Sequence, residues 1–335
     1  MDYNGKTGMI PILRKIVAAA SNFRGATLLM IIIVIFIIMI FTSPAFLTSA
    51  NLKTTAMGFS ADGIVVIGMT LALVSGGVDL SVGSVYMLAG VVTGKLWLLG
   101  VNVWIAVLGG LFVGLLCGLF VGIWVGRLGI NPLITSLAMM GMARGAGYII
   151  TQGTPLSLYR MPKEFTSLGS DVFFGLPIFV VFFLVITVVF HFLTNRANVF
   201  RKIFYIGSNE NAAVLSGINV AKVKVYVYTM VAALSSVAGI LTVARFKVAT
   251  PSVGGGMELA AIAAAVIGGC SLRGGEGSVI GSVLGILLLA LIRNAMVLHD
   301  VSVYWQAFVA GFILVVAVTI DQLGQRRRMK KKTTI

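Results

Sequence analysis

Residues 27–42 read TLLMIIIVIFIIMIFT, a run without a single charged side chain. A helix that crosses a bilayer needs about 20 mostly apolar residues, and fewer when it packs inside a bundle. A basic arm precedes the run, so a secretory signal peptide is the alternative, but the length and strength of the apolar stretch favour a retained helix. The stretch therefore predicts a membrane protein.

The composition agrees with a membrane environment. Of the 335 residues, 59% are apolar and only 10% are charged, whereas about a quarter are charged in ordinary soluble domains. Cys117 and Cys270 both lie in apolar segments, which predicts small packing residues and no disulfide.

The sequence shows no motif of an enzyme or a metal site. It has no phosphate loop of the Gly-x-x-x-x-Gly-Lys type, no nucleophile elbow and no Cys-x-x-Cys pair, and His191 and His299 have no partner at metal-ligand spacing. We therefore expect no catalytic residue, metal or cofactor in this chain. The energy for any pumping must come from an ion gradient or from a separate ATPase.

Hydropathy predicts an all-α polytopic membrane protein of about ten transmembrane helices. The predicted crossings are residues 27–42, 55–75, 81–96, 103–125, 132–150, 177–194, 225–244, 258–271, 278–297 and 303–320. Glycine-rich joints at 76–80 and 251–257 precede the third and eighth crossings, which are short.

Basic residues predict the orientation, because Lys and Arg collect in cytoplasmic loops. With the N-terminus inside, 17 of the 25 basic residues fall on the inner side and six on the outer side. We therefore expect an N-terminal arm (1–26), a loop (195–224) and a basic tail (321–335) in the cytoplasm.

The net charge of +15 does not indicate nucleic-acid binding. The densest basic run, at residues 326–332, directly follows the last crossing. A run at that position is typical of a topology anchor that contacts anionic membrane lipid.

A short pattern occurs twice, each time between two predicted helices. Residues 76–80 read GGVDL and residues 255–259 read GGMEL. By the predicted topology the first joint faces the cytoplasm and the second faces outward, which predicts an inverted repeat of spans 2–5 and 7–10, a common device of transporters. Chance similarity in a glycine-rich chain is the alternative.

Polar groups near the joints and within the spans are candidates for function. Asp79 and Glu258 can each cap the helix that follows, or act in gating or solute passage. The candidate residues for the solute path or its gating are Asp79, Ser81, Asn131 and Glu258.

Two arginines lie within predicted spans, where charges are costly and often functional. For Arg144 and Arg293 we expect either snorkelling or an internal ion pair, and Asp62, expected near the outer end of its span, could pair with either one. Glycines at every fourth position predict close helix packing at Gly110, Gly114, Gly118 and Gly122.

The inner loop 195–224 contains a possible short helix. Asn209 or Asn211 could cap it and Gly217 could end it. A short helix with small residues on one face can sit in the groove of a soluble partner, although a solvated connector fits the pattern as well.

Over nearly its whole length, the chain resembles the membrane subunits of bacterial ABC importers of the ribose, galactose, xylose and arabinose type. The strings that carry the resemblance are VSGGVDLSVGS at 74–84, GSN at 207–209, SGINV at 216–220 and AAAVIGG at 263–269, followed by glycines at 274, 275 and 277.

The resemblance implies a coupling motif at Asn211, Ala212, Ala213 and Gly217, which docks on the ATPase. Asn211 stands where the family carries Glu, and Ala260 stands where relatives often carry Asp. The implied partners are a cytoplasmic ATPase that binds ATP and Mg, a periplasmic or lipid-anchored solute-binding protein, and a second permease copy or paralogue.

The implied function is passage of a monosaccharide across the inner membrane of a bacterium, with this chain as a multi-pass subunit. Relatives with the same architecture carry a furanosyl signal molecule, a nucleoside or a branched-chain amino acid. The alternatives from other classes are an ion-coupled secondary carrier and a non-transporting scaffold.

Overall fold

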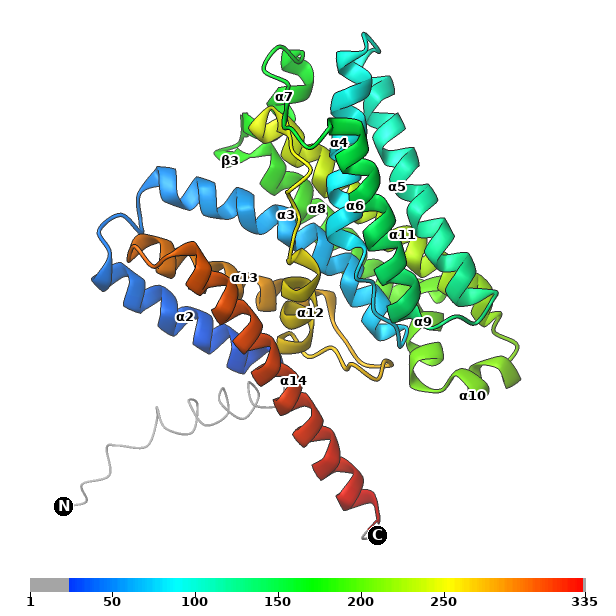
Figure 1. Cartoon of the computed structure of the whole chain (residues 1–335). Coiled ribbons are helices and arrows are strands. Elements are labelled where there is room, and N and C mark those ends of the chain that lie inside the picture. The colour runs from blue at the N-terminus through cyan, green and yellow to red at the C-terminus, as the bar shows by residue number, and fades with distance from the viewer. Residues whose placement is uncertain (1–23, 334–335) are drawn as a thin grey trace, which may run out of the picture.

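Within residues 24–333, which the computed structural model describes, a helix occupies each of the ten predicted crossings (Figure 1). These helices are α2 (Arg24–Thr42), α3 (Ser49–Val74), α4 (Val82–Leu98), α5 (Val103–Gly126), α6 (Pro132–Thr151), α8 (Ile178–Arg196), α11 (Val220–Phe246), α12 (Met257–Ile267), α13 (Val279–Leu298) and α14 (Val303–Thr333). The predicted all-α polytopic fold is confirmed. Most of the predicted arm 1–26, and residues 334–335 of the predicted tail, lie outside the described residues.

Seven of these helices are long and apolar enough to cross a membrane by themselves. The shorter apolar helices are α4, α12 and the stretch Val303–Thr319 of α14. Cys117 is half-buried in α5, and Cys270 is buried just beyond the end of α12.

Polar residues set where many of the helices begin. A side-chain oxygen accepts a hydrogen bond from the first turn at the N-caps Thr48, Asn102, Asn131, Asn219 and Ser278. Such bonds satisfy backbone N–H groups that the helix itself leaves without partners.

Helices α3 and α11 form the centre of the molecule. Of the most apolar window of each, 78% is buried, against less than half in the other five long spans. The predicted glycine stripe of α5 packs here: Gly110, Gly114, Gly118 and Gly122 are buried against α4 and α11. A Cβ at Gly118 would lie 2.6 Å from the carbonyl oxygen of Tyr228, so only glycine permits this approach.

The packing of the two halves follows the predicted repeat. Helix α11 packs on α4 and α5, and α3 packs on α12 and α13. Within the halves, α4 contacts α5 and α6 just as α12 contacts α13 and α14. If α3, α4, α5 and α6 correspond to α11, α12, α13 and α14, each contact in one half has its counterpart in the other. This is expected if α3–α6 and α11–α14 are repeated units.

The loops gather at two opposite ends of the bundle (Figure 1). One end holds α7 (Lys163–Ser170), the hairpin of β2 (Val172–Phe173) with β3 (Leu176–Pro177), and the antiparallel pair of β1 (Leu156–Ser157) with β4 (Val248–Ala249). The other end holds α9 (Asn198–Ser208) and α10 (Glu210–Leu215). The end with α7 and the strands carries loops that were predicted to lie outside, and we call it the outer end. The end with α9 and α10 is called the inner end.

The eighth crossing differs from the prediction of a helix over 258–271. Helix α12 ends at Ile267, because two glycines follow and Gly269 takes a φ of +97°. Its 11 residues span about 16 Å, roughly half of a bilayer core of about 30 Å.

Candidate functional site

The first glycine joint holds a buried carboxylate. Asp79 is 1% exposed, and its Oδ1 accepts hydrogen bonds from the backbone N–H of Ser81 at 2.8 Å and from the Ser81 hydroxyl at 2.6 Å. Ser81 occupies the N-cap position of α4, and its own side chain makes no capping bond. Asp79 therefore does not cap α4 itself, but holds the N-cap residue Ser81 in place.

The second joint does not stay at the outer end, as the sequence predicted. Ala249 lies beside Gly94 near the outer end of α4, whereas Gly254 lies against Gly83 near the start of α4. Gly83 and Gly94 are about 16 Å apart along the helix. Residues 249–254 therefore run down α4 without forming a helix, in turns from Pro251 onward, and this descent to α12 is visible in Figure 1.

Glu258 lies in the first turn of α12, after the N-cap Gly256. Its Oε2 lies 3.0 Å from the position that a Cβ of Gly83 would occupy. The descent of the second joint thus brings Glu258 to the start of α4, two residues beyond Ser81.

Asn131 precedes Pro132, whose side chain lies 3.5 Å from the position that a Cβ of Gly77 in the first joint would occupy. It is exposed at the start of α6, and its side chain accepts the N–H of Leu133 at 2.9 Å. Its place in a solute path stays a prediction.

Within residues 24–333 the hydrogen-bond partners of the Arg144 guanidinium are main-chain carbonyls, which neither expectation named. Its Nη1 donates to the carbonyl oxygens of Pro251 at 3.0 Å and of Val253 at 2.6 Å. For Arg293 the ion-pair alternative is correct, because its Nη1 lies 3.2 Å from Oδ2 of Asp62. Asp62 is not near the outer end of its helix, because α3 begins at Ser49, six residues before the predicted start.

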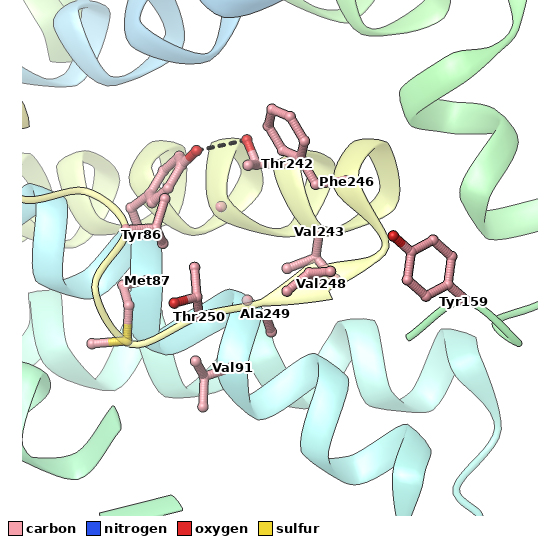
Figure 2. Close-up of a pocket in the computed structure, with 13 residues that line it drawn as sticks. Tyr86, Met87, Val91, Tyr159, Thr242, Val243, Phe246, Val248, Ala249 and Thr250 are labelled. Atoms are coloured by element: carbon pink, nitrogen blue, oxygen red, sulfur yellow. Dashed lines mark hydrogen bonds between the residues drawn. The ribbon is translucent and has the colours of Figure 1, made fainter. Parts of the chain in front are cut away.

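The non-helical segment 248–253 forms one wall of a cavity of about 390 Å³ between α4 and α11. Figure 2 shows Tyr86 of α4 facing Thr242 of α11, and the Tyr86 hydroxyl donates to Oγ1 of Thr242 at 2.6 Å. Tyr159, Phe246 and Thr250 also line the cavity. Aromatic faces beside a few hydroxyl groups are the usual lining of a site for a small polar solute.

Sequence reasoning missed these lining residues. The available signal was a tyrosine inside the glycine-rich helix 82–98. Thr242 and Tyr159 come from segments far away in the sequence, and only folding brings them to Tyr86.

At the inner end, α10 has the form expected of the short helix. The Asn209 side chain accepts the N–H of Ala212 at 3.0 Å, and Gly217 ends the turn with a φ of +77°. Asn211, Ala212 and Gly217 are exposed, but Ala213 is buried, so the small residues do not share one outward face.

The outward side of α10 is apolar instead. At the inner end, Leu215 is 89% exposed and Val214 is 56% exposed, so other described residues leave these two apolar side chains largely uncovered. An ion pair of Lys224 with Glu210, at 2.8 Å, ties α10 to the start of α11.

Glycines connect α10 to the first joint. The end of α9 packs at Gly207 between Val74 at the end of α3 and Gly275 in the α12–α13 loop, and the Gly275 N–H donates to the Val74 carbonyl at 2.9 Å. A side chain at Gly207 would collide with the Val74 carbonyl. The end of α9, which directly precedes α10, therefore packs against the joint that holds Asp79.

Residues 51–318 match the model of a family described as the permease component of the branched-chain amino acid transport system. The chain belongs to this permease family. It is 38% identical to the L-arabinose transport system permease protein AraH of Escherichia coli K12 over 90% of this chain and 91% of the relative. It is 33% identical to the ribose import permease protein RbsC of Bacillus subtilis 168, over 90% and 91%, and 33% identical to the D-allose transport system permease protein AlsC of E. coli K12, over 83% and 85%.

No solved structure matches the chain. This permease is a multi-pass inner-membrane protein and a transport subunit, as its family and its apolar helices establish.

Proposed function

We propose that this permease passes a monosaccharide across the inner membrane, driven by a separate cytoplasmic ATPase that docks on α10. A solute-binding protein delivers the sugar at the outer end, and both chain termini lie in the cytoplasm. A second permease, either a copy or a paralogue, completes the pathway.

The observation that carries the proposal is the outer cavity. Tyr86, Tyr159 and Phe246 offer ring faces, and Thr242 and Thr250 offer hydroxyl groups, which together suit the alternating apolar and hydroxyl surfaces of a sugar. The named relatives carry arabinose, ribose and allose, which favours a sugar over the branched-chain amino acid in the family description.

The exposed apolar side chains of α10 support the docking step. A large apolar group at 89% exposure on an inner-end helix is typical of a surface that a partner covers. ATP binding and hydrolysis in that partner would shift the population between two packings of the helices.

The test is uptake by proteoliposomes that contain the permease with its ATPase and binding protein. We expect ATP-dependent uptake of labelled arabinose, ribose or allose, and none of leucine. Uptake driven by an ion gradient without an ATPase would contradict the proposal. Selective uptake of leucine would show that the transported solute is an amino acid and not a sugar.

Labelling tests the orientation separately. A cysteine at Asn211 should react with an impermeant thiol reagent in inside-out vesicles and stay unlabelled in intact cells.

A further inference from the structure

The eighth crossing leaves a stretch of backbone without helical partners. Helix α12 covers about half of the bilayer core, and the non-helical residues 249–256, which form turns from Pro251 onward, cover the rest. Backbone N–H and C=O groups at membrane depth must find partners, because each unsatisfied group costs several kcal/mol in hydrocarbon. Such a segment persists only where other parts of the protein, or water in a cavity, satisfy it.

The carbonyls at the middle of this segment bond to one side chain. Pro251 has no N–H to contribute, and its carbonyl and that of Val253 both accept from Nη1 of Arg144. The turn is further fixed by the hydroxyls of Thr250 and Ser252, which lie 3.0 Å apart. No acidic group within residues 24–333 is recorded as an ion-pair partner of Arg144, so these carbonyls are its recorded bonds.

The bonded carbonyls belong to the wall of the solute cavity. Thr250 and Val253 line it, and Pro251 lies between them. Just beyond, Gly254 lies against Gly83, so the segment fits between α4 on one side and Arg144 of α6 on the other.

Helix α6 in turn packs on α4, where a Cβ at Gly147 would collide with Met87, another cavity residue. A movement of α6 relative to α4 would therefore shift Arg144 and the cavity wall together.

We propose that Arg144 is a positioning residue of the transport path, which holds the non-helical segment 250–254 against α4 and so sets the shape of the solute cavity. A guanidinium suits this task because it is permanently charged and carries donors in a fixed plane, whereas a lysine ammonium is more strongly hydrated. The proposal rests on the proposed function only in taking the cavity as part of the path.

The test measures the segment and the transport separately. Spin labels at Ser252→Cys and Thr154→Cys, in full-length chain carrying Cys117→Ala and Cys270→Ala, report the distance from the segment to the end of α6. Both label positions are exposed. In Arg144→Met we expect a broadened distance distribution, and sugar uptake by cells about tenfold lower, as for the loss of hydrogen bonds to a charged group.

Arg127→Met is the matched control, because Arg127 is exposed at the inner end of α5, away from the cavity. It should keep the parent distance distribution and uptake. An unchanged distribution in Arg144→Met would overturn the proposal, and so would a broadened one with parent uptake.

Arg144→Lys covers the case in which Arg144→Met fails to insert. Its side chain is shorter, so we expect it to broaden the distribution to a smaller extent, and a parent-like distribution would again overturn the proposal. If the parent itself takes up no sugar, the proposed function fails, while the distance measurement still decides whether Arg144 holds the segment.

Discussion

At the scale of single residues, Asp79 illustrates how a buried charge can serve geometry. Both of its recorded hydrogen bonds go to Ser81, the N-cap residue of α4. Removal of the carboxylate would leave a backbone N–H and a hydroxyl buried without an acceptor, at about 1–3 kcal/mol for each group.

We therefore expect Asp79→Ala to lower sugar uptake at least tenfold and to lower the melting temperature. Asp79→Asn keeps one acceptor oxygen and should fall between Asp79→Ala and the parent. Asp171→Ala, at an exposed position in the outer loops, is the control and should match the parent in uptake and in thermal unfolding of the purified protein. Equal effects at the two sites would show that the buried bonds do not matter.

The polar residues also show what sequence reasoning can reach. The repeated joint pattern points to Asp79, and the rarity of charge at membrane depth points to Arg144 and Arg293. Their partners were not all predictable, because Arg144 bonds to main-chain carbonyls, which carry no signature in the sequence. The pairing of Arg293 with Asp62 was one of the alternatives, and only the position of α3 decides it.

At the scale of elements, α5 and α11 approach so closely that side chains are excluded between them. Gly118→Ala would place a Cβ against backbone atoms of Tyr228 and Thr229, which have little freedom to move. Overpacking of this kind costs about 1–3 kcal/mol, so we expect a lower melting temperature. Gly141→Ala on α6 has open space around it and should leave the melting temperature unchanged. Equal melting temperatures of the two variants would contradict the packing argument.

The short helix α10 presents an apolar tip at Leu215, which is 89% exposed. If an ATPase covers this tip, Leu215→Glu should reduce the amount of ATPase that purifies with the permease about tenfold, as expected when an apolar anchor of an interface is lost. Leu128→Glu, at another exposed leucine beyond the end of α5, is the matched control and should retain the ATPase. If the Leu215→Glu variant purifies with as much ATPase as the parent, Leu215 does not belong to the interface.

Hydropathy predicted the existence of all ten crossings but not the form of the eighth. The apolar run 258–271 contains Gly268 and Gly269, which end the helix, and residues 249–254 are not apolar enough to be recognised as part of a crossing. Their position depends on Gly83 and Arg144, far away in the sequence, so only tertiary contacts place them at membrane depth.

At the scale of the whole molecule, two regions meet along α4. Residues 86–91 of α4 border the solute cavity, and its start adjoins the joint that packs, through Gly76 and Gly207, on the end of α9. A displacement of α10 at the inner end can therefore reach the cavity wall through α4 and the segment at Gly254. This continuity gives the two repeated halves a physical route by which a cytoplasmic partner changes access to an outer site.

The two halves are also joined by charge, because Asp62 lies on α3 and Arg293 lies on α13. Asp62 is 18% exposed at its side chain and Arg293 is 50% exposed, so this is a partly buried pair rather than a surface one. Asp62→Asn and Arg293→Gln should each lower the melting temperature and the uptake. Because both remove the same contact, the double variant should be no worse than the more damaging single one, with a coupling of about 1 kcal/mol.

A double-mutant cycle with Lys224→Gln and Glu210→Gln is the control, because this pair joins α10 to the adjacent α11 and does not link the two halves. These two substitutions should couple less in stability. Strict additivity of Asp62→Asn with Arg293→Gln would mean that the halves are held by packing alone.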